Sequence, residues 1–365
     1  MNHAQQWSIT WRERKETANI FYGLMLIMVM STPFISVIIP NHRKGRFFEE
    51  AVKSVLEQTL ETSKFEIIVV RDYRDEFVSQ FLKLHNITDV IIDEVPLGPK
   101  LAKGIEISKG EVVSFLEDDD LFIPNKLEFV YDMFYGNQRL LFYHDRVKTI
   151  SENGNYKTDL LRKKNSKAMK VSVGNKTLKC ISRMIEYSSH MDLSAISIKR
   201  RIVTQRIETL KNMNMSCDSL MFYSSLDQEG GDMIIDNREW TKYRIHASSS
   251  SIVGNLDEFV KSSVKFHSEC LSGFLNIKST VHDEETLKFI ERSIIESRYI
   301  LYLLTFDLKF KLKVRDFINL VVKNWLIYCT SPYYLFLLTL SFLPRKFLLL
   351  IRVLYYHNIQ VRLNA

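Results

Sequence analysis

The chain has 365 residues, 46% of them hydrophobic and 25% charged, with a formal net charge of +7. This ordinary globular composition can bury a substantial core in one or two domains. The cysteines are far apart and form no CxxC pair, so we expect neither a zinc knuckle nor a disulfide framework, and a reducing cytosol suits them: Cys180, Cys217, Cys270 and Cys329.

Near the N-terminus, residues 20–30 form an apolar stretch that is too short to span a bilayer and lacks a small-residue cleavage site. Met30 directly precedes the first good strand pattern. We therefore interpret residues 1–29 as a non-native upstream extension, which is a hypothesis.

From residue 34 onward, buried-strand and amphipathic-helix patterns alternate. We expect strands at 34–39, 65–70, 90–92 and 111–116, and helices between them at 46–60, 77–84 and 101–108. Such alternation predicts an α/β fold whose sheet is mainly parallel and is flanked by helices on both faces.

An acidic tetrad, Glu117-Asp118-Asp119-Asp120, follows the fourth of these strands. Ligands collect at the carboxyl ends of such strands, and hard cations such as Mg²⁺ and Mn²⁺ prefer carboxylate oxygens. The tetrad therefore suggests a divalent-metal site that holds a nucleotide diphosphate. Alternatively, Asp119 or Asp120 caps a helix that begins after Pro124, although capping explains one carboxylate rather than four.

The pattern changes from about residue 141. A polar, Lys-rich stretch up to residue 179 indicates a variable loop region, apolar segments return at 193–198 and 220–223, and 284–304 is typical of a long amphipathic helix. We expect a nucleotide-sugar-binding half at 30–135, an acceptor-side half at 136–255, a helical extension at 256–316 and a membrane-associating tail at 317–365.

The tail is basic, aromatic and aliphatic. Residues 305–365 contain nine Lys/Arg and two acidic residues, a balance of 9 − 2 = +7. This combination favours a membrane surface over nucleic acid, because base-stacking modules place aromatics in polar grooves. Ser331-Pro332 interrupts the uncharged stretch between Lys323 and Arg345, which favours in-plane or re-entrant helices over a clean span. A buried helical subdomain or an oligomer interface remains an alternative.

Several ordered motifs resemble those of the inverting family-2 nucleotide-sugar glycosyltransferases with the GT-A fold. The matching segments are Ile38-Ile39-Pro40-Asn41-His42-Arg43, Ser54-Val55-Leu56-Glu57-Gln58-Thr59, Glu66 to Asp72, Gly104 to Glu111, and Phe115 to Glu128. The resemblance covers residues 34 to about 250 and implies a GT-A domain followed by the helical C-terminal region.

The resemblance also implies roles for the donor side of the site. Glu117-Asp118-Asp119 occupies the family's Asp-x-Asp motif, with Asp119 the expected metal ligand. Glu117 replaces the usual aspartate and reaches one methylene further towards ribose or metal-bound water. On the nucleotide side the resemblance implicates four residues: Pro40 and Asn41 in the pocket, Asp72 at the base and Lys100 near the diphosphate.

For the acceptor side, Cys217-Asp218-Ser219-Leu220 resembles the segment whose aspartate is the general base, with Cys217 in place of a glutamate. Asp218 is thus the expected catalytic residue, while helix capping is its ordinary structural role. Tyr243-Arg244-Ile245-His246 resembles a later family segment, so Arg244 or His246 is expected to touch the diphosphate or the metal.

The implied activity is Mn²⁺- or Mg²⁺-dependent inverting transfer of a sugar from a nucleotide-diphosphate donor to a hydroxyl of a glycan or lipid-linked acceptor, at the cytoplasmic face of the membrane. No nucleic-acid partner is expected. The alternatives are transfer to polyprenyl phosphate and a catalytically inactive, membrane-attached scaffold. A sugar-phosphate nucleotidyltransferase ranks low, because the loop after the first strand has one glycine, Gly45.

Overall fold

The computed structural model describes residues 32–43, 45–157, 167–246, 255–311, 313 and 345–364. The expected upstream extension, 1–29, lies outside the described residues. So do residues 314–344, which hold most of the expected membrane-associating tail.

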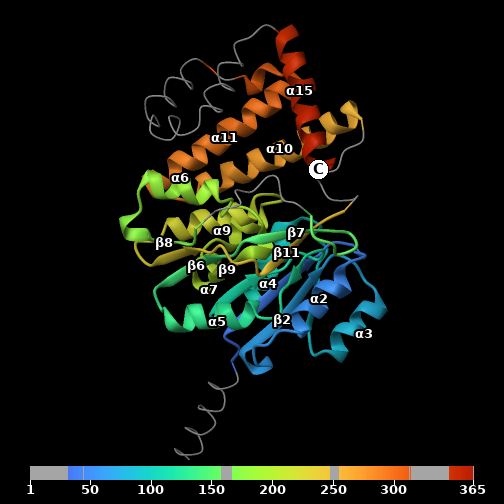
Figure 1. Cartoon of the computed structure of the whole chain (residues 1–365), viewed down its shortest axis with the longest axis vertical. Helices are drawn as coiled ribbons and strands as arrows, with labels where there is room; N and C mark the ends of the chain where they lie inside the picture. The colour runs from blue at the N-terminus through green and yellow to red at the C-terminus, as the bar shows by residue number, and fades with distance from the viewer. Residues whose placement is uncertain are drawn as a thin grey trace, which may run out of the picture.

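A mixed eight-stranded sheet lies in the body of the molecule, in the order β3-β2-β1-β4-β9-β6-β10-β8 (Figure 1). The first four strands in this order are parallel, as predicted, whereas β9 runs antiparallel to both of its neighbours and β8 is an antiparallel edge strand. Their bounds are β1 Ile35–Asn41, β2 Phe65–Arg71, β3 Thr88–Ile91, β4 Val112–Phe115, β6 Leu140–His144, β8 Met169–Ser172, β9 Ile196–Lys199 and β10 Asp232–Ile235.

Helices cover both faces of this sheet, because the side chains of each strand alternate between two cores. In β1, Ile38 joins one core, whereas Val37 and Ile39 join the other. The first core is closed by α4 Leu97–Ile107, α6 Leu178–Glu186, α7 Arg200–Thr204, α8 Ile207–Lys211 and α9 Cys217–Leu226, and the second by α2 Phe48–Leu56, α3 Glu76–Leu84 and α5 Lys126–Gly136. The prediction of a mainly parallel sheet between two helical layers is confirmed.

The polar region expected to be a variable loop contains more regular structure than its composition indicates. Strand β7 (Val147–Ser151) pairs in parallel with β11 (Thr241–Ile245), which also pairs with β5 (Leu121–Phe122) in a second, three-stranded sheet. Strand β8 and the start of α6 also fall in this region. The partner strands of β7 and β8 lie about 60 to 100 residues further along the chain. The local sequence pattern therefore gave little indication of these strands.

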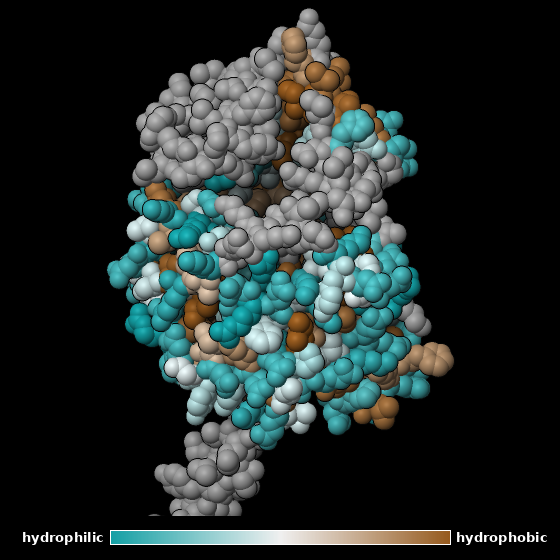
Figure 2. Space-filling model, in the orientation of Figure 1, coloured by the Kyte–Doolittle hydropathy of each residue, from teal (hydrophilic) through white to brown (hydrophobic). Residues whose placement is uncertain are grey.

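The C-terminal region is helical, as expected. The helices α10 (Leu256–Lys278) and α11 (Glu284–Thr305) pack side by side, and α15 (Arg345–Asn364) packs against both (Figure 1). Asn255 forms a capping box at the start of α10, and Asp283 caps α11. Figure 2 shows hydrophobic residues gathered over α15, where Phe347, Leu349 and Leu350 are exposed. Among the described residues, no helix is both long and apolar enough to cross a bilayer.

Candidate functional site

The carboxyl ends of β1, β2 and β4 meet at one edge of the large sheet. Asn41 at the end of β1 is in register with Arg71 at the end of β2, and Ile38 is in register with Phe115 at the end of β4. The residues that follow these strands therefore come together, as the predicted topology requires.

On the side of this edge that is predicted to bind the nucleotide (the nucleotide side), Asp72 is held by cationic and backbone donors. The ammonium of Lys100 donates to its carboxylate at 2.7 Å, the backbone N–H of Arg43 donates at 3.1 Å, and Nδ1 of His42 lies 2.5 Å away. Burial raises the pKa of Asp72, but the hydrogen bonds from Lys100, Arg43 and His42 outweigh it and lower the pKa to about 2. The carboxylate is therefore ionised, and the predicted base and diphosphate contacts, Asp72 and Lys100, touch each other.

Asn41 at the end of β1 carries buried polar atoms. Its side chain is fully buried, and neither its Nδ2 nor its Oδ1 makes a hydrogen bond of ordinary geometry among the described residues. The buried hydroxyl of neighbouring Tyr73 likewise makes none there; burial raises the Tyr73 pKa to about 12, and its interaction with the Asn41 side chain lowers that pKa only slightly. Leaving a buried amide unpaired costs roughly 1–3 kcal/mol, so these atoms are suited to a polar ligand. Pro40, the other predicted pocket residue, lies within β1 opposite Val70.

The acidic loop, residues 117–120, is separated from the end of β4 by one residue. Two hydrogen bonds connect it to neighbouring segments. The backbone N–H of Glu117 donates to Oγ of Ser194 at 2.9 Å, and the backbone N–H of His42 donates to Oδ2 of Asp118 at 3.0 Å. Burial is the main reason that the pKa of Asp118 rises to about 7, against the hydrogen bond from His42. Asp118 thus links the acidic loop to the nucleotide side.

Capping does not explain these carboxylates. Helix α5 begins at Lys126, and its N-cap residue is Asn125, which forms no side-chain cap. Asp119 instead lies 2.8 Å from Nε2 of His246, and Asp120 accepts the backbone N–H of Arg244 at 2.9 Å. The alternative that Asp119 or Asp120 caps this helix is therefore wrong.

Strand β11 carries both Arg244 and His246 to the acidic loop. The Arg244 guanidinium is buried and donates to the Asp119 carbonyl at 2.9 Å, the Glu152 carbonyl at 2.8 Å and the Glu50 carboxylate at 2.7 Å. It also lies 4.3 Å from the centre of the Phe47 ring. In this arrangement Arg244 links the acidic loop to α2. The guanidinium would have to break some of these hydrogen bonds to make the predicted contact with a diphosphate.

Asp218 lies in the first turn of α9 and faces the acidic loop. Its Oδ1 accepts the backbone N–H of Ser219 at 2.7 Å, which is the local contact expected of a first-turn acid. Burial is the main cause that raises the pKa of Asp218 to about 7, and the charge of Asp192 adds to it. Backbone hydrogen bonds act in the opposite direction. A carboxylate with a pKa near 7 is well matched to general-base work at neutral pH.

Together these carboxylates form the acidic cluster: Glu117, Asp119, Asp120, Asp192 and Asp218. Burial and the charges of the other four raise the pKa of Glu117 well above its ordinary value. Burial and the charge of Asp119 also raise the pKa of Asp120, against hydrogen bonds from the Ser194 hydroxyl and the Arg244 backbone. Its Oδ2 is buried and makes no hydrogen bond of ordinary geometry in the described part of the chain. Such a cluster is stabilised by a proton or by a bound cation.

The predicted metal residues were Glu117, Asp119 and His246. Asp119 and His246 are in contact, and the charge of Asp119 acts on Glu117. Across the described ranges, no three His, Cys, Asp or Glu side chains are arranged closely enough to hold an ion together. The chemistry of the donor set fits a hard cation all the same, because carboxylate oxygens predominate and one of them, on Asp120, makes no hydrogen bond of ordinary geometry in the described residues.

Sequence reasoning missed two contributors to this site, Asp192 and Ser194. Both belong to the short turn η3 (Leu193–Ala195) and its N-cap, which lie in the half predicted from the sequence to be on the acceptor side. Asp192 has a left-handed backbone conformation with φ of 62°, which is uncommon for a residue other than glycine. An isolated Asp and Ser before an apolar strand carry no distinctive sequence signal, so only the fold identifies them.

Comparisons with known proteins agree with this geometry. Residues 36–190 match the family described as "Glycosyl transferase family 2". The chain is 35% identical over 126 residues to an uncharacterized glycosyltransferase of Rickettsia bellii. This match covers 33% of this chain and 18% of that protein. It is 32% identical over 98 residues to glycosyltransferase AglE of Haloferax volcanii, covering 25% of this chain and 32% of that protein. The chain thus spans less than a third of the length of either relative.

Among solved structures, the fold is similar to that of S. aureus TarS 1-349. The TM-score is 0.51 at 14% sequence identity, covering 79% of this chain and 78% of the other. The same protein in complex with UDP gives a TM-score of 0.51, covering 90% and 87% of the two chains. At this identity the likeness establishes the fold alone.

Proposed function

We propose that the protein transfers a sugar from a nucleotide-diphosphate donor to a hydroxyl of a glycan or lipid-linked acceptor, because residues 36–190 match the family described as "Glycosyl transferase family 2". The observation that carries the proposal is the position of Asp218. The charge of this proposed base acts on Glu117 in the acidic loop that follows β4, and the loop contacts His42, the residue after the buried Asn41.

Each part of the site has a role in this reaction. Asn41 and Asp72 bind the nucleotide, and Asp218 accepts the proton of the acceptor hydroxyl as the nucleotide diphosphate leaves. One base and one displacement invert the anomeric carbon, unlike glycosidases, which use two carboxylates. Asp119, with Glu117 and His246, would hold a Mn²⁺ or Mg²⁺ ion, which would supply positive charge opposite the leaving diphosphate.

The C-terminal region supports a place at the cytoplasmic face of the membrane. The exposed apolar residues of α15 are accompanied by the basic excess of residues 305–365. Apolar and basic groups together favour binding to anionic lipid surfaces. We therefore propose a lipid-linked or membrane-bound glycan as the acceptor. Sedimentation of the full chain with anionic vesicles, compared with neutral ones, tests this location.

Thermal unfolding with candidate donors tests the donor and the metal together. The full chain is heated with UDP-, GDP- or dTDP-sugars, in Mn²⁺ or in EDTA; UDP is the nucleotide named in the complex of the staphylococcal structure. A donor at about 100 times its dissociation constant adds roughly 2.7 kcal/mol of stability. We expect this increase with one nucleotide and only with metal, and we expect it to vanish in Asp119→Ala. The absence of a shift with every donor would favour the scaffold alternative.

The stereochemical part of the proposal has its own test. The product formed from an α-linked donor is analysed by NMR for the configuration of the new linkage. A β-linked product supports inversion by a single displacement. An α-linked product contradicts it and leaves the donor proposal in place.

A further inference from the structure

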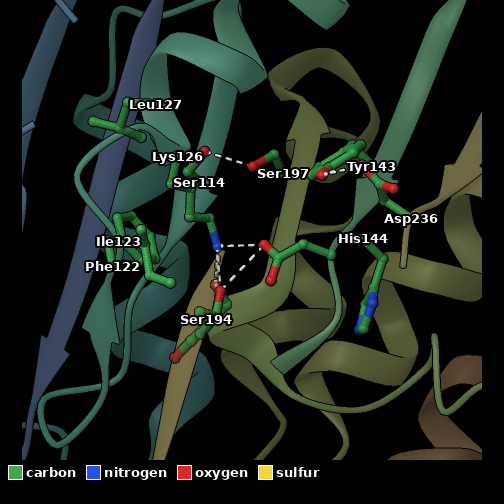
Figure 3. Close-up of polar contacts among 12 residues, drawn as sticks. Ser114, Phe122, Ile123, Lys126, Leu127, Tyr143, His144, Ser194, Ser197 and Asp236 are labelled. Carbon is green, nitrogen blue, oxygen red and sulfur yellow. Dashed lines mark hydrogen bonds and ion pairs between the residues drawn. The ribbon is translucent and has the colours of Figure 1, made fainter. Parts of the chain in front are cut away.

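A buried ion pair joins segments from four parts of the chain beside the acidic cluster. The ammonium of Lys126 lies 2.7 Å from Oδ2 of Asp145, and neither side chain is exposed. The same ammonium donates to the carbonyl of Ser194 and to Oγ1 of Thr241, each at 2.6 Å (Figure 3). One side chain of α5 thus contacts the end of β6, the turn η3 and the first residue of β11.

Each of the contacted segments reaches the acidic loop within a few residues. In η3, the hydroxyl of Ser194 accepts the backbone N–H of Glu117, and Asp192 lies at the N-cap. In β11, two residues separate Thr241 from Arg244, which binds the loop through its backbone and its guanidinium. Lys126 itself follows the loop by six residues.

The ion pair is also placed to hold η3 in a conformation that the turn does not favour by itself. Asp192 has positive φ, and the backbone N–H of Asp145 donates to the Ala195 carbonyl at 3.1 Å at the other end of η3. Thr241 reinforces the arrangement, since its hydroxyl lies 3.1 Å from the Asp145 carboxylate and 3.2 Å from the Ser194 carbonyl. The same network therefore holds the turn at the carbonyls of Ser194 and Ala195.

We propose that Lys126, paired with Asp145, is a positioning residue for the acidic loop: its ammonium fixes η3 and β11 against residues 117–120 and so prepares the site for a divalent cation. This inference rests on the proposed function only for the divalent cation; the positioning of the loop rests on the contacts of Lys126. It assigns Lys126 no contact with donor, acceptor or metal. Outer contacts of this kind typically change metal affinity by about 10–100-fold when they are removed.

Stability alone is a weak reason for such a pair. Replacing a buried ion pair by apolar residues of similar volume is often neutral or stabilising, whereas removing one partner leaves a buried charge. The double variant Lys126→Met/Asp145→Leu therefore separates positioning from folding. The matched control is Ser114→Ala/Ser197→Ala, which removes a buried 2.7 Å hydroxyl pair between β4 and β9 in the same region (Figure 3).

Two measurements on the full chain test the proposal. The first is the affinity for Mn²⁺ alone, by calorimetry, alongside the unfolding temperature in EDTA. The second is hydrogen exchange of the Glu117 amide without metal. In the double variant we expect an unfolding temperature near that of the wild type, at least about tenfold weaker Mn²⁺ binding, and at least about tenfold faster exchange. The control should match the wild type in both.

The outcomes separate this inference from the proposed function. Unchanged Mn²⁺ affinity and unchanged exchange in a folded double variant overturn the inference and leave the proposed function standing. Faster exchange in a protein whose wild type binds no Mn²⁺ supports the positioning of the loop and contradicts metal dependence. If the double variant does not fold, Thr241→Val decides, because it keeps the Lys126–Asp145 pair and deletes only the contacts of the Thr241 hydroxyl with Lys126, Asp145 and Ser194. Unchanged exchange in that variant overturns the inference.

Discussion

The nucleotide side and the acidic cluster lie at the same edge of one sheet, yet they balance charge in opposite ways. Asp72 is compensated by Lys100 within the protein, so its pKa is low and its charge is permanent. Glu117, Asp120 and Asp218 are buried among one another, so their pKa values are raised. The negative charge of the first region is compensated within the protein. The negative charge of the second region is not, so a proton or a cation would stabilise it.

Removing the proposed base is the strongest way to test the acidic side. Asp218→Asn keeps the size and the local hydrogen bond to Ser219 but cannot accept a proton, so we expect transfer to fall by about 10²–10⁴-fold with folding intact. The measurement is the initial rate of product formation. Cys217→Ala, at the preceding position, should stay within a few-fold of the wild type. If Asp218→Asn retained most of the activity, an anionic polyprenyl-phosphate acceptor, which needs little base, would become the better interpretation.

The nucleotide side should be most sensitive to loss of its internal cation. Lys100→Met leaves the Asp72 carboxylate, which is 3% exposed, without its main partner, and breaking a buried pair in this way costs about 3 kcal/mol or more. Urea unfolding measures the loss. Lys278→Met removes a half-exposed pair with Glu291 between α10 and α11 and should change stability by less than about 1 kcal/mol. Equal effects of the two variants would mean that Asp72 is not charge-compensated by Lys100.

The two regions should also differ in the sign of their pH dependence. The pKa of Asp218, raised from its ordinary value near 4 to about 7, means that the folded state binds a proton more readily, so this group destabilises the fold as pH rises from about 4 to about 7. The pKa of Asp72 is lowered to about 2, so its stabilisation is complete above about pH 4 and is lost as pH falls through about 2.

Unfolding free energies measured in EDTA from pH 2 to 8 check both signs. Asp218→Asn should reduce the fall in stability across the upper window, to which Asp118 also contributes because its pKa is raised to about 7, and should leave the lower window unchanged. Asp72→Asn should remove the loss of stability at low pH and leave the upper window unchanged. A wild-type curve that rises between pH 4 and 7, and that Asp218→Asn does not alter, would remove the argument that Asp218 is a base with a pKa near 7.

The smallest expected effect concerns Glu117. Glu117→Asp restores the shorter side chain of the family motif while keeping its charge, so we expect only a few-fold change in the Mn²⁺ concentration needed for half-maximal donor binding. Glu117→Gln, which removes the charge at the same length, should have a larger effect. If the two variants behaved alike, the carboxylate of Glu117 would not contribute to cation binding.

Prediction from the sequence was most successful where local pattern and topology coincide. The first four strands, the helices between them and the long α11 follow from apolar periodicity, and the meeting of Asp72 with the acidic loop follows from parallel strand order. The regular structure between residues 141 and 179 was missed, because β7 and β8 depend on partners far along the chain. For the same reason, no local signal pointed to Asp192 or Ser194.

By itself, then, the sequence determined the resemblance to family-2 glycosyltransferases, the parallel part of the sheet and the identity of most candidate residues, because these depend on periodicity and on contiguous motifs. Only the tertiary structure decided what those residues touch: Lys100 on Asp72, Arg244 as a tie between the acidic loop and α2, and Lys126 at the junction of η3 and β11. The physical reason is that charge compensation and desolvation are properties of neighbours in space. Those neighbours here come from segments up to about two hundred residues apart, and burial changes the free energy of an ionised group more than any feature of its local sequence.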